Sequence, residues 1–394
     1  MFAFIYSKMN LRKLALAILP LLVAGSEIDS FTFRSQTLSA NTSAANDKID
    51  QITNARIEEA VNKLNADSQG HCASLNDLEK TLAEAIGDKY IAGVNAMVGI
   101  VEDDVNKGHS PYLKDINGTE VEIPVTRTPS DVHIYNVFDF WKERGFITTN
   151  RFIEFVTIKM VDTSQREAVV GSDKLSHFFS TGLEYLNKYR EIMKDFEGST
   201  LPQSFVEKYA FEQTLAHGVD TEVGKFGMGK HKGTVGTGVF SFADMSANFA
   251  GLQFWTRLTR ANSVQNVTGP SIVSFENGTA SMAIPPKVMM FHPKDKRSHE
   301  PYFECQNGRW VMTKPFQWAE YVSPAWDEGI NPNEFKAASM KDKFQARLRD
   351  LYEKGVLSQP TLPLDASMCQ QLSTIAPTNV LPYILHPDCY ALLK

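Results

Sequence analysis

The sequence predicts a mainly α-helical protein with a smaller β-rich section, which places it in the α+β class. Helices are indicated by an apolar stripe at helical spacing within residues 45–66 and by polar pairs four positions apart between residues 172 and 251. The β-rich section is indicated between residues 265 and 325, where Asn-Gly pairs separate aromatic and β-branched runs. These patterns predict a helical core domain joined to that β-rich section.

The N-terminus has the order of an export signal. Arg12 and Lys13 precede an apolar run from Leu14 to Ala24, which is too short to span a bilayer, and small residues follow it. We therefore expect residues 1–26 to be a signal peptide. The mature chain is then periplasmic or secreted and soluble, with no transmembrane helix beyond the signal. An uncleaved N-terminal anchor is the alternative.

Charge and composition narrow the class of protein. The chain of 394 residues is 43% hydrophobic and 22% charged, which is ordinary for a globular protein, and its net charge is -6. Nucleic-acid binding relies on clustered Lys and Arg, which here are dispersed and outnumbered by acidic residues. The expected partner is therefore a ligand or a protein of the cell envelope, and not a nucleic acid.

Residues 27–105 are expected to form an N-terminal helical hairpin region. Ile49, Ile52 and Ile57 recur at helical spacing, with charged and amide side chains on the opposite face. The pattern resumes in residues 75–91 after a polar break. A hairpin or a short coiled coil accounts for both stretches.

Residues 106–262 are expected to form the central helical domain. Loops with a short strand are predicted up to residue 132, followed by a helix that begins at Val132. A second helix is predicted over residues 150–161, and further helices begin at Ser172.

A glycine-rich, basic segment at residues 222–238 interrupts this helical pattern. Gly224 to Lys230 has the outline of a phosphate-binding P-loop, but His231 stands where that motif needs Ser or Thr to ligate magnesium. A lid over neighbouring polar residues and an ordinary connecting loop are the two other interpretations.

Residues 263–330 form the predicted β-rich section, in which aromatic side chains concentrate. Trp310, Trp318, Tyr321 and Trp326 lie close together in the sequence. They fit either a packed core or a platform for a carbohydrate or peptide.

Residues 331–394 are expected to form a helix from Phe335 to Tyr352 and a cysteine-containing tail. Disulfides persist in oxidising compartments, and four cysteines allow three pairings that the sequence does not distinguish. The local pair of Cys369 with Cys389 is the simplest expectation. Cys72 and Cys305 are the other two cysteines.

Acidic, amide and imidazole side chains recur within apolar sequence between residues 172 and 251. Asp173 with His177, and Asp244 with Asn248, are four residues apart, so each pair projects from one face of a helix. A buried carboxylate is costly unless it is paired, hydrogen-bonded or bound to a metal. We therefore expect these side chains to converge in one pocket.

The candidate site residues fall into two groups. The candidate catalytic residues are Asp173, His177, Glu212 and Asp244, and the candidate ligand-binding residues are Lys174 and Asn248. Imidazole and carboxylate together suit a divalent metal, although no diagnostic metal spacing is present. Acid and base chemistry by a carboxylate and His177, with Lys174 holding an anionic group, is the alternative.

Helix capping explains part of this pattern without a ligand. Ser172 can cap a helix whose positive end Asp173 favours, and Ser241 with Asp244 resembles a capping box. Capping does not account for Glu212, or for the imidazole and amide groups as a set.

The same residues resemble a known signature. The order Asp-Lys-x-x-His-Phe, then Glu, then Ser-x-x-Asp-x-x-Ala-Asn-x-x-Gly is similar to the polar signature of VanZ-like proteins and of some predicted periplasmic lipoproteins. The matching residues are Asp173, Lys174, His177, Glu212, Asp244, Asn248 and Gly251. VanZ-like proteins place these motifs in membrane-spanning helices, which this chain is not expected to have. The resemblance therefore implies that these polar residues form a cluster, but it does not identify a reaction.

The function expected from the sequence is that of an exported cell-envelope protein. It would bind, and in one version hydrolyse, an envelope-derived ligand at a buried Asp/His/Glu/Asn cluster. The alternative is a noncatalytic structural or interaction protein that uses the helical hairpin as its contact surface.

Overall fold

The structure is a computed structural model. It describes residues 44–87, 97, 112–122, 126–127, 156–171, 173–223, 239–259, 273–276, 279–282, 301–335, 338–355, 366–376 and 380–393. The predicted export signal, the helix expected from Val132 and the glycine-rich segment after Val223 lie outside these residues.

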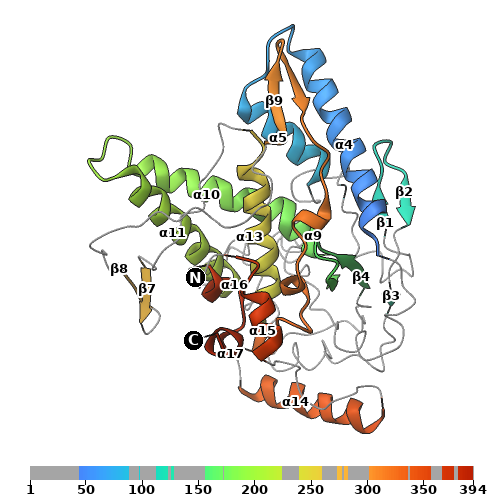
Figure 1. Ribbon diagram of the computed structural model, residues 1–394, viewed down its shortest axis with the longest axis vertical. Coiled ribbons are helices and arrows are strands. Elements are labelled where there is room, and N and C mark those ends of the chain that lie inside the picture. The colour runs from blue at the N-terminus through green and yellow to red at the C-terminus, as the bar shows by residue number, and fades with distance from the viewer. Residues whose placement is uncertain are drawn as a thin grey trace, which may run out of the picture.

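Helices dominate the described chain, as the sequence predicts, and the strands are short (Figure 1). The α-helices are α4 (Asn46–Asp67), α5 (Leu75–Ile86), α9 (Asp173–Ser176), α10 (Gly182–Asp195), α11 (Gln203–Val223), α13 (Phe242–Thr256), α14 (Ala338–Glu353), α15 (Ala366–Leu372), α16 (Leu381–Ile384) and α17 (Pro387–Ala391). A π-helical turn, η4 (His177–Thr181), joins α9 to α10, and two short 3-10 helices are η6 (Trp318–Glu320) and η7 (Pro324–Trp326).

The described strands form small antiparallel sheets. The three-stranded sheet has the order β3 (Thr126–Arg127), β4 (Val156–Val161) and β5 (Glu167–Gly171). The two-stranded sheets pair β1 (Tyr112–Lys114) with β2 (Glu120–Glu122), β6 (Val239–Phe240) with β11 (Glu334–Phe335), β7 (Val273–Glu276) with β8 (Thr279–Met282), and β9 (Phe303–Gln306) with β10 (Arg309–Met312).

The Asn-Gly pairs stand where the sequence predicts turns. In the β9–β10 hairpin, Asn307 has φ 51° and Gly308 has φ 76°, and Gln306 pairs with Arg309 across them. A two-residue turn with both φ values positive matches the twist of the flanking strands. The hairpin expectation is confirmed here, and β7 and β8 likewise flank the other Asn-Gly pair.

The prediction of a helix over residues 150–161 is wrong for residues 156–161, the part that the structure describes. Val156–Val161 is strand β4, and it pairs with β5 in the register Ile158 to Val170. β-branched residues fill much of this segment, and they lose side-chain freedom in a helix but pack well on a pleated sheet. The partner strand follows after a short turn, which makes a local hairpin available.

Within the region expected to hold a helical hairpin, the structure describes two consecutive helices, α4 and α5. In α4 the apolar stripe is buried, and α5 begins at the cap Ser74, whose side chain accepts a hydrogen bond from the Asp77 N–H. Asp50 and Asn54 on α4 accept hydrogen bonds from the backbone N–H groups of Trp318 and Phe316 at 2.7 Å each. The apolar and polar sides of α4 are therefore both docked onto the body of the protein.

Two disulfides join distant and local segments. Cys369 bonds to Cys389, as expected, and Cys72 bonds to Cys305. The second bridge links the loop between α4 and α5 to strand β9, and these elements form the upper part of the molecule in Figure 1. Among the described residues, no helix has both the length and the apolar character needed to cross a bilayer.

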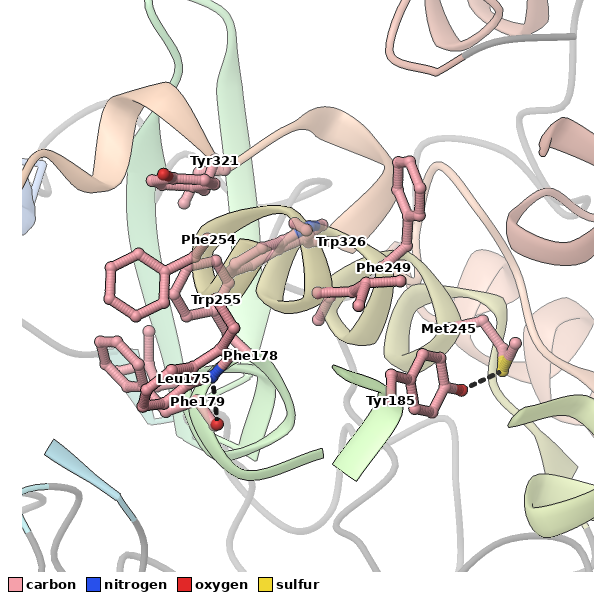
Figure 2. Packing of buried hydrophobic residues seen from close by; sticks show 14 of the residues in the cluster. Leu175, Phe178, Phe179, Tyr185, Met245, Phe249, Phe254, Trp255, Tyr321 and Trp326 are labelled. Carbon is pink, nitrogen blue, oxygen red and sulfur yellow. Dashed lines mark hydrogen bonds between the residues drawn. The ribbon is translucent and has the colours of Figure 1, made fainter. Parts of the chain in front are cut away.

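An aromatic cluster forms the centre of the core (Figure 2). The ring of Phe178 lies 4.9 Å from that of Trp318 and 5.0 Å from that of Tyr321, centroid to centroid. Trp318, Tyr321 and Trp326 are buried, and Trp310 is half-buried with its indole N–H donating to the Ala73 carbonyl at 3.0 Å, which favours the core interpretation of these aromatic residues.

Helix α13 is the axis of this core, because every residue from Phe242 to Thr256 is buried. It approaches η4 and α10 through glycines. A Cβ atom added to Gly251 would overlap the carbonyl oxygen of Phe178, and one added to Gly182 would lie 2.6 Å from the Gly251 backbone. Close approach lets the Trp255 indole N–H donate to the Phe179 carbonyl at 2.8 Å.

We predict that Gly251→Ala destabilises the protein by about 3 kcal/mol, because overpacking of a tight core forces backbone shifts. Chemical denaturation of the purified protein measures this. Gly355→Ala is the matched control, since Gly355 has φ +71° and open space around the added Cβ. The control should lose only about 1 kcal/mol from backbone strain. Equal losses in both variants would contradict the close-packing account.

Candidate functional site

One side of the site is a continuous helical segment made of α9, η4 and α10. The π-helical turn begins at His177, whose carbonyl accepts the N–H of Gly182. Single π-helical turns inside helices are frequent at functional sites. Lys174 and His177 are three residues apart, so both side chains reach the same neighbouring helix, α13.

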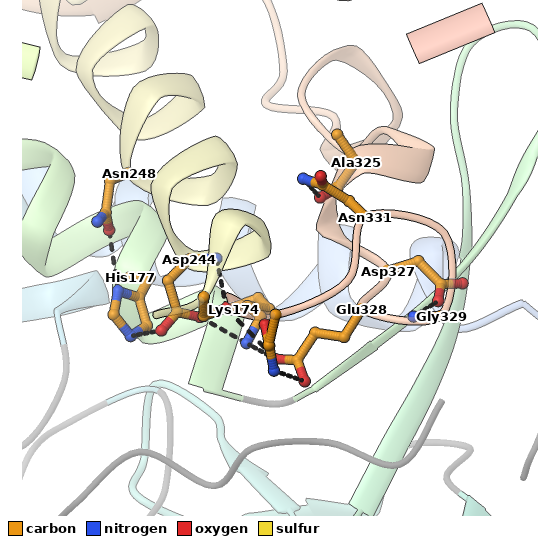
Figure 3. A network of polar contacts seen from close by, with 11 residues as sticks. Lys174, His177, Asp244, Asn248, Ala325, Asp327, Glu328, Gly329 and Asn331 are labelled. Carbon is orange, nitrogen blue, oxygen red and sulfur yellow. Dashed lines mark hydrogen bonds and ion pairs between the residues drawn. The ribbon is translucent and has the colours of Figure 1, made fainter. Parts of the chain in front are cut away.

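Lys174 is the centre of a buried ion-pair cluster (Figure 3). Its Nζ lies 2.5 Å from Asp244 Oδ1 and 2.8 Å from Glu328 Oε1, and its side chain is 1% exposed. Among the described residues Asp244 Oδ1 has no hydrogen-bond partner, so the Lys174 charge compensates that oxygen. A buried ammonium with two carboxylates is stable only while both partners stay in place.

His177 is held between two groups of α13. Its Nδ1 lies 2.9 Å from Asn248 Oδ1, and its Nε2 lies 3.4 Å from Asp244 Oδ2. The Asn248 amide donates in turn to the Tyr185 hydroxyl at 3.2 Å, which orients the amide oxygen toward the imidazole. Because both ring nitrogens then face oxygen atoms, the arrangement favours the imidazolium form, which donates from both.

Glu328 completes the cluster from the loop after η7. Its Oε2 accepts a hydrogen bond from Asn333 Nδ2 at 2.9 Å, and its Oε1 lies 3.5 Å from Ser241 Oγ. Ser241 also caps α13 by accepting the Asp244 N–H at 3.1 Å. With His177 protonated, the described members of the cluster carry two positive and two negative charges.

The pKa of Asp244 reflects this environment. Burial by itself opposes ionisation of the carboxyl group, but the charges of His177 and Lys174 outweigh burial and hold its pKa below the ordinary value. Asp244 is therefore a carboxylate at neutral pH and acts as the anionic link between Lys174 and His177.

The structure brings together four of the six candidate residues: Lys174, His177, Asp244 and Asn248. Glu212 is not among the contacts described for this cluster. It lies on α11, fully buried, with its Oε1 3.9 Å from Lys208 Nζ. Asp173 begins α9, and its side chain lies outside the described part of the chain.

Three members of the network have no signal in the sequence. Glu328 and Asn333 come from a loop far along the chain, and Tyr185 lies on α10. The helical spacing that identifies Asp244 and Asn248 cannot identify residues that reach the site from an irregular loop. The capping role expected of Ser241 is present, while the Asp244 side chain turns to Lys174.

The charged side chains of the cluster are paired mainly with one another. Lys174 occupies the position between Asp244 and Glu328 that a cation would take, and the described residues contain no group of three or more metal-ligating side chains. A His general base needs one ring nitrogen directed at the reacting group. Here Nδ1 faces Asn248 Oδ1 and Nε2 faces Asp244 Oδ2.

The opposite face of α13 lines a cavity of about 220 Å³. Ser246, Phe249, Ala250 and Gln253 face it at helical spacing, whereas Asp244 and Asn248 project to the other side. In Figure 2 Phe249 and Tyr321 lie on the side of α13 away from Tyr185 and Phe179. The remaining walls come from the β4–β5 turn, η6, η7 and the segments around α15 and α16.

Several polar groups around this cavity have no protein partner. The Trp326 indole N–H is buried and without a hydrogen bond. Within the part of the chain that the structure describes, the side chains of Ser246, Gln253 and Ser323 also make no hydrogen bond, and their polar atoms keep some access to the cavity. Buried polar groups in native proteins are nearly always paired with protein, water or a ligand.

No protein-family model, curated protein or solved structure matches this chain. The VanZ-like resemblance therefore stays a prediction from its motifs.

We predict that Asp244→Asn destabilises the protein by about 3 to 5 kcal/mol at neutral pH, because it leaves buried Lys174 with one fewer counter-charge. Asp350→Asn is the control, since it removes one partner of an exposed pair, Lys354 with Asp350 at 2.9 Å. The control should change stability by about 0.5 kcal/mol or less. Denaturant unfolding of both variants provides the measurement.

The difference in unfolding free energy between wild type and Asp244→Asn should depend on pH. Because the pKa of Asp244 is lowered in the folded state, its contribution is complete above the ordinary Asp pKa and is lost as the pH falls through the folded value. The difference between wild type and Asp244→Asn should therefore shrink below about pH 4. A difference that grows on acidification would refute the assignment of Asp244 as the charged partner.

Proposed function

We propose that this chain is an extracytoplasmic binding protein that holds a small ligand in the cavity beside α13, with the ion-pair cluster as its rigid support. The observation that carries the proposal is the buried Trp326 indole N–H, which has no partner, together with the side chains of Ser246 and Gln253, which line the cavity without a hydrogen bond among the described residues. An unpaired buried polar group costs about 1 to 3 kcal/mol, so a cavity that keeps one beside further polar side chains is suited to a ligand that pairs with them.

The compartment is supported by the two disulfides. Such bonds form and persist in periplasmic, secreted and other oxidising environments and are rare in the cytosol. Cys72–Cys305 and Cys369–Cys389 include all four cysteines of the chain. The N-terminal signal-like segment supports the same proposal from the sequence.

Binding is favoured over hydrolysis by the geometry of the cluster. Each ring nitrogen of His177 faces a protein oxygen, and Lys174 is enclosed by two carboxylates. The Ser241 hydroxyl caps α13 by accepting the Asp244 N–H. These groups satisfy one another, which suits a support more than a reacting centre.

The helical hairpin is a weaker candidate for the contact surface. Its apolar residues Ile49, Ile52 and Ile57 are buried in the common core, and α10 holds α5 through Arg190, which binds both carboxylate oxygens of Glu79 at 2.6 Å. The apolar face that would recognise a partner is thus already in use within the chain.

The test is ligand-observed NMR on the purified protein with a panel of small carboxylates, alcohols, polyols and amines. We expect at least one member to bind wild type and to lose binding in Ala250→Phe, which fills the cavity with a larger side chain. Ala391→Phe, at an exposed position on α17, is the matched control and should bind as wild type does.

Gln253→Leu serves as a second variant, because it removes the unpaired amide at similar volume. If Ala250→Phe fails to fold, loss of binding in Gln253→Leu still supports the site. Binding that is unchanged in every folded cavity variant, or absent from wild type across the panel, would refute the proposed function.

A further inference from the structure

The polar groups around the cavity offer more free donors than acceptors. Arg166 lines the cavity and uses its Nε to bind Asp162 Oδ2 at 2.6 Å. Among the described residues its two Nη groups have no partner. The Trp326 indole is a donor only, and the Gln253 amide supplies donors beside its single oxygen. A ligand that pairs with these donors must be rich in hydrogen-bond acceptors.

The two carboxylates of the lining are already neutralised. Asp162 accepts the N–H groups of Ser164 and Arg166 at 2.8 and 2.9 Å in addition to the guanidinium. Glu320 is paired with Lys314 at 3.0 Å and accepts the Tyr302 hydroxyl at 3.0 Å. Each of the two carboxylates therefore has a cationic partner and presents no uncompensated charge that would repel an anion.

Size and apolar contacts restrict the ligand further. The cavity of about 220 Å³ lies below the range of about 300 to 1,000 Å³ that is usual for drug-sized ligands. Phe249, Ala250, Val322, Ile375 and Ile384 supply its apolar wall. The complementary ligand is a small molecule with one apolar part and one acceptor-rich head group.

We propose that the cavity binds a small aliphatic carboxylate, whose carboxylate group is held by the Arg166 guanidinium and whose chain lies against the apolar wall. This inference rests on the proposed binding function and names its ligand class. Guanidinium matches a carboxylate through parallel N–H donors, which gives both strength and geometry. The Gln253 and Trp326 donors extend the set available to the carboxylate and to any further oxygen of the ligand.

The test uses three probes of equal chain length that differ in the head group: butanoate, 1-butanol and butylammonium. Affinities for wild type are measured by ligand-observed NMR titration. We expect butanoate to bind at least tenfold more tightly than either other probe, because a charge-assisted hydrogen bond is worth about a factor of ten or more. Arg166→Gln should remove that preference.

Controls separate the site from a general charge effect. Arg309→Gln makes the same substitution at an exposed position on β10 and should leave butanoate binding unchanged. Arg166→Lys keeps the charge but loses the parallel N–H donors of the guanidinium, so it should recover only part of the affinity. If Arg166→Gln lowers the melting temperature, the double variant Asp162→Asn with Arg166→Gln, which leaves no unpaired charge, replaces it.

The outcomes distinguish this inference from the proposed function. If 1-butanol or butylammonium binds as well as butanoate, and Ala250→Phe abolishes that binding, the carboxylate assignment fails while the cavity remains a binding site. The same conclusion follows if only polyols of the wider panel bind. If butanoate binds equally to wild type, Arg166→Gln and Ala250→Phe, it binds elsewhere and the inference is overturned.

Discussion

The buried ammonium of Lys174 is the constraint on which the rest of the structure depends. Removing a charged group from water costs several kcal/mol, and here the cost is offset only when Asp244 from α13 and Glu328 from a distant loop arrive together. The segment of α9 and η4, the helix α13 and the loop after η7 must therefore dock in one arrangement. Alternatives that leave any of the three charges alone are strongly disfavoured, so the cluster specifies the packing as well as supporting it.

Helix α13 has no face toward solvent, and this explains how one helix serves two polar environments. On one side Asp244 and Asn248 belong to a network in which each charge has a partner. On the other side Ser246 and Gln253 face a cavity without hydrogen-bond partners among the described residues. The polar groups of the first side are paired with one another, while those of the second side face the cavity, where the proposed ligand would bind.

Glycine and the π-helical turn set the distances within this arrangement. Gly251 and Gly182 allow the backbones of α13 and the η4–α10 segment to meet with no side chain between them. The extra residue in the turn at His177 changes the direction of the side chains that follow it, so that Phe178 and Phe179 enter the aromatic core while His177 stays with α13. The polar cluster and the aromatic core are thus consequences of the same close contact.

The sequence by itself determined those features that depend on local chemistry. Periodic apolar residues specify α4, and the Asn-Gly pair specifies the β9–β10 turn, because only certain residues adopt its positive φ angles. Spacing also identified His177, Asp244 and Asn248, and the resemblance to the VanZ-like signature added Lys174. The tertiary structure decided the rest: β4 is a strand because β5 pairs with it, and Glu328 joins Lys174 across 154 positions. The cavity beside α13 has no local signature in the sequence, since its walls come from elements that meet only on folding. A periodic pattern predicts which residues are buried, but it does not predict which other elements cover them.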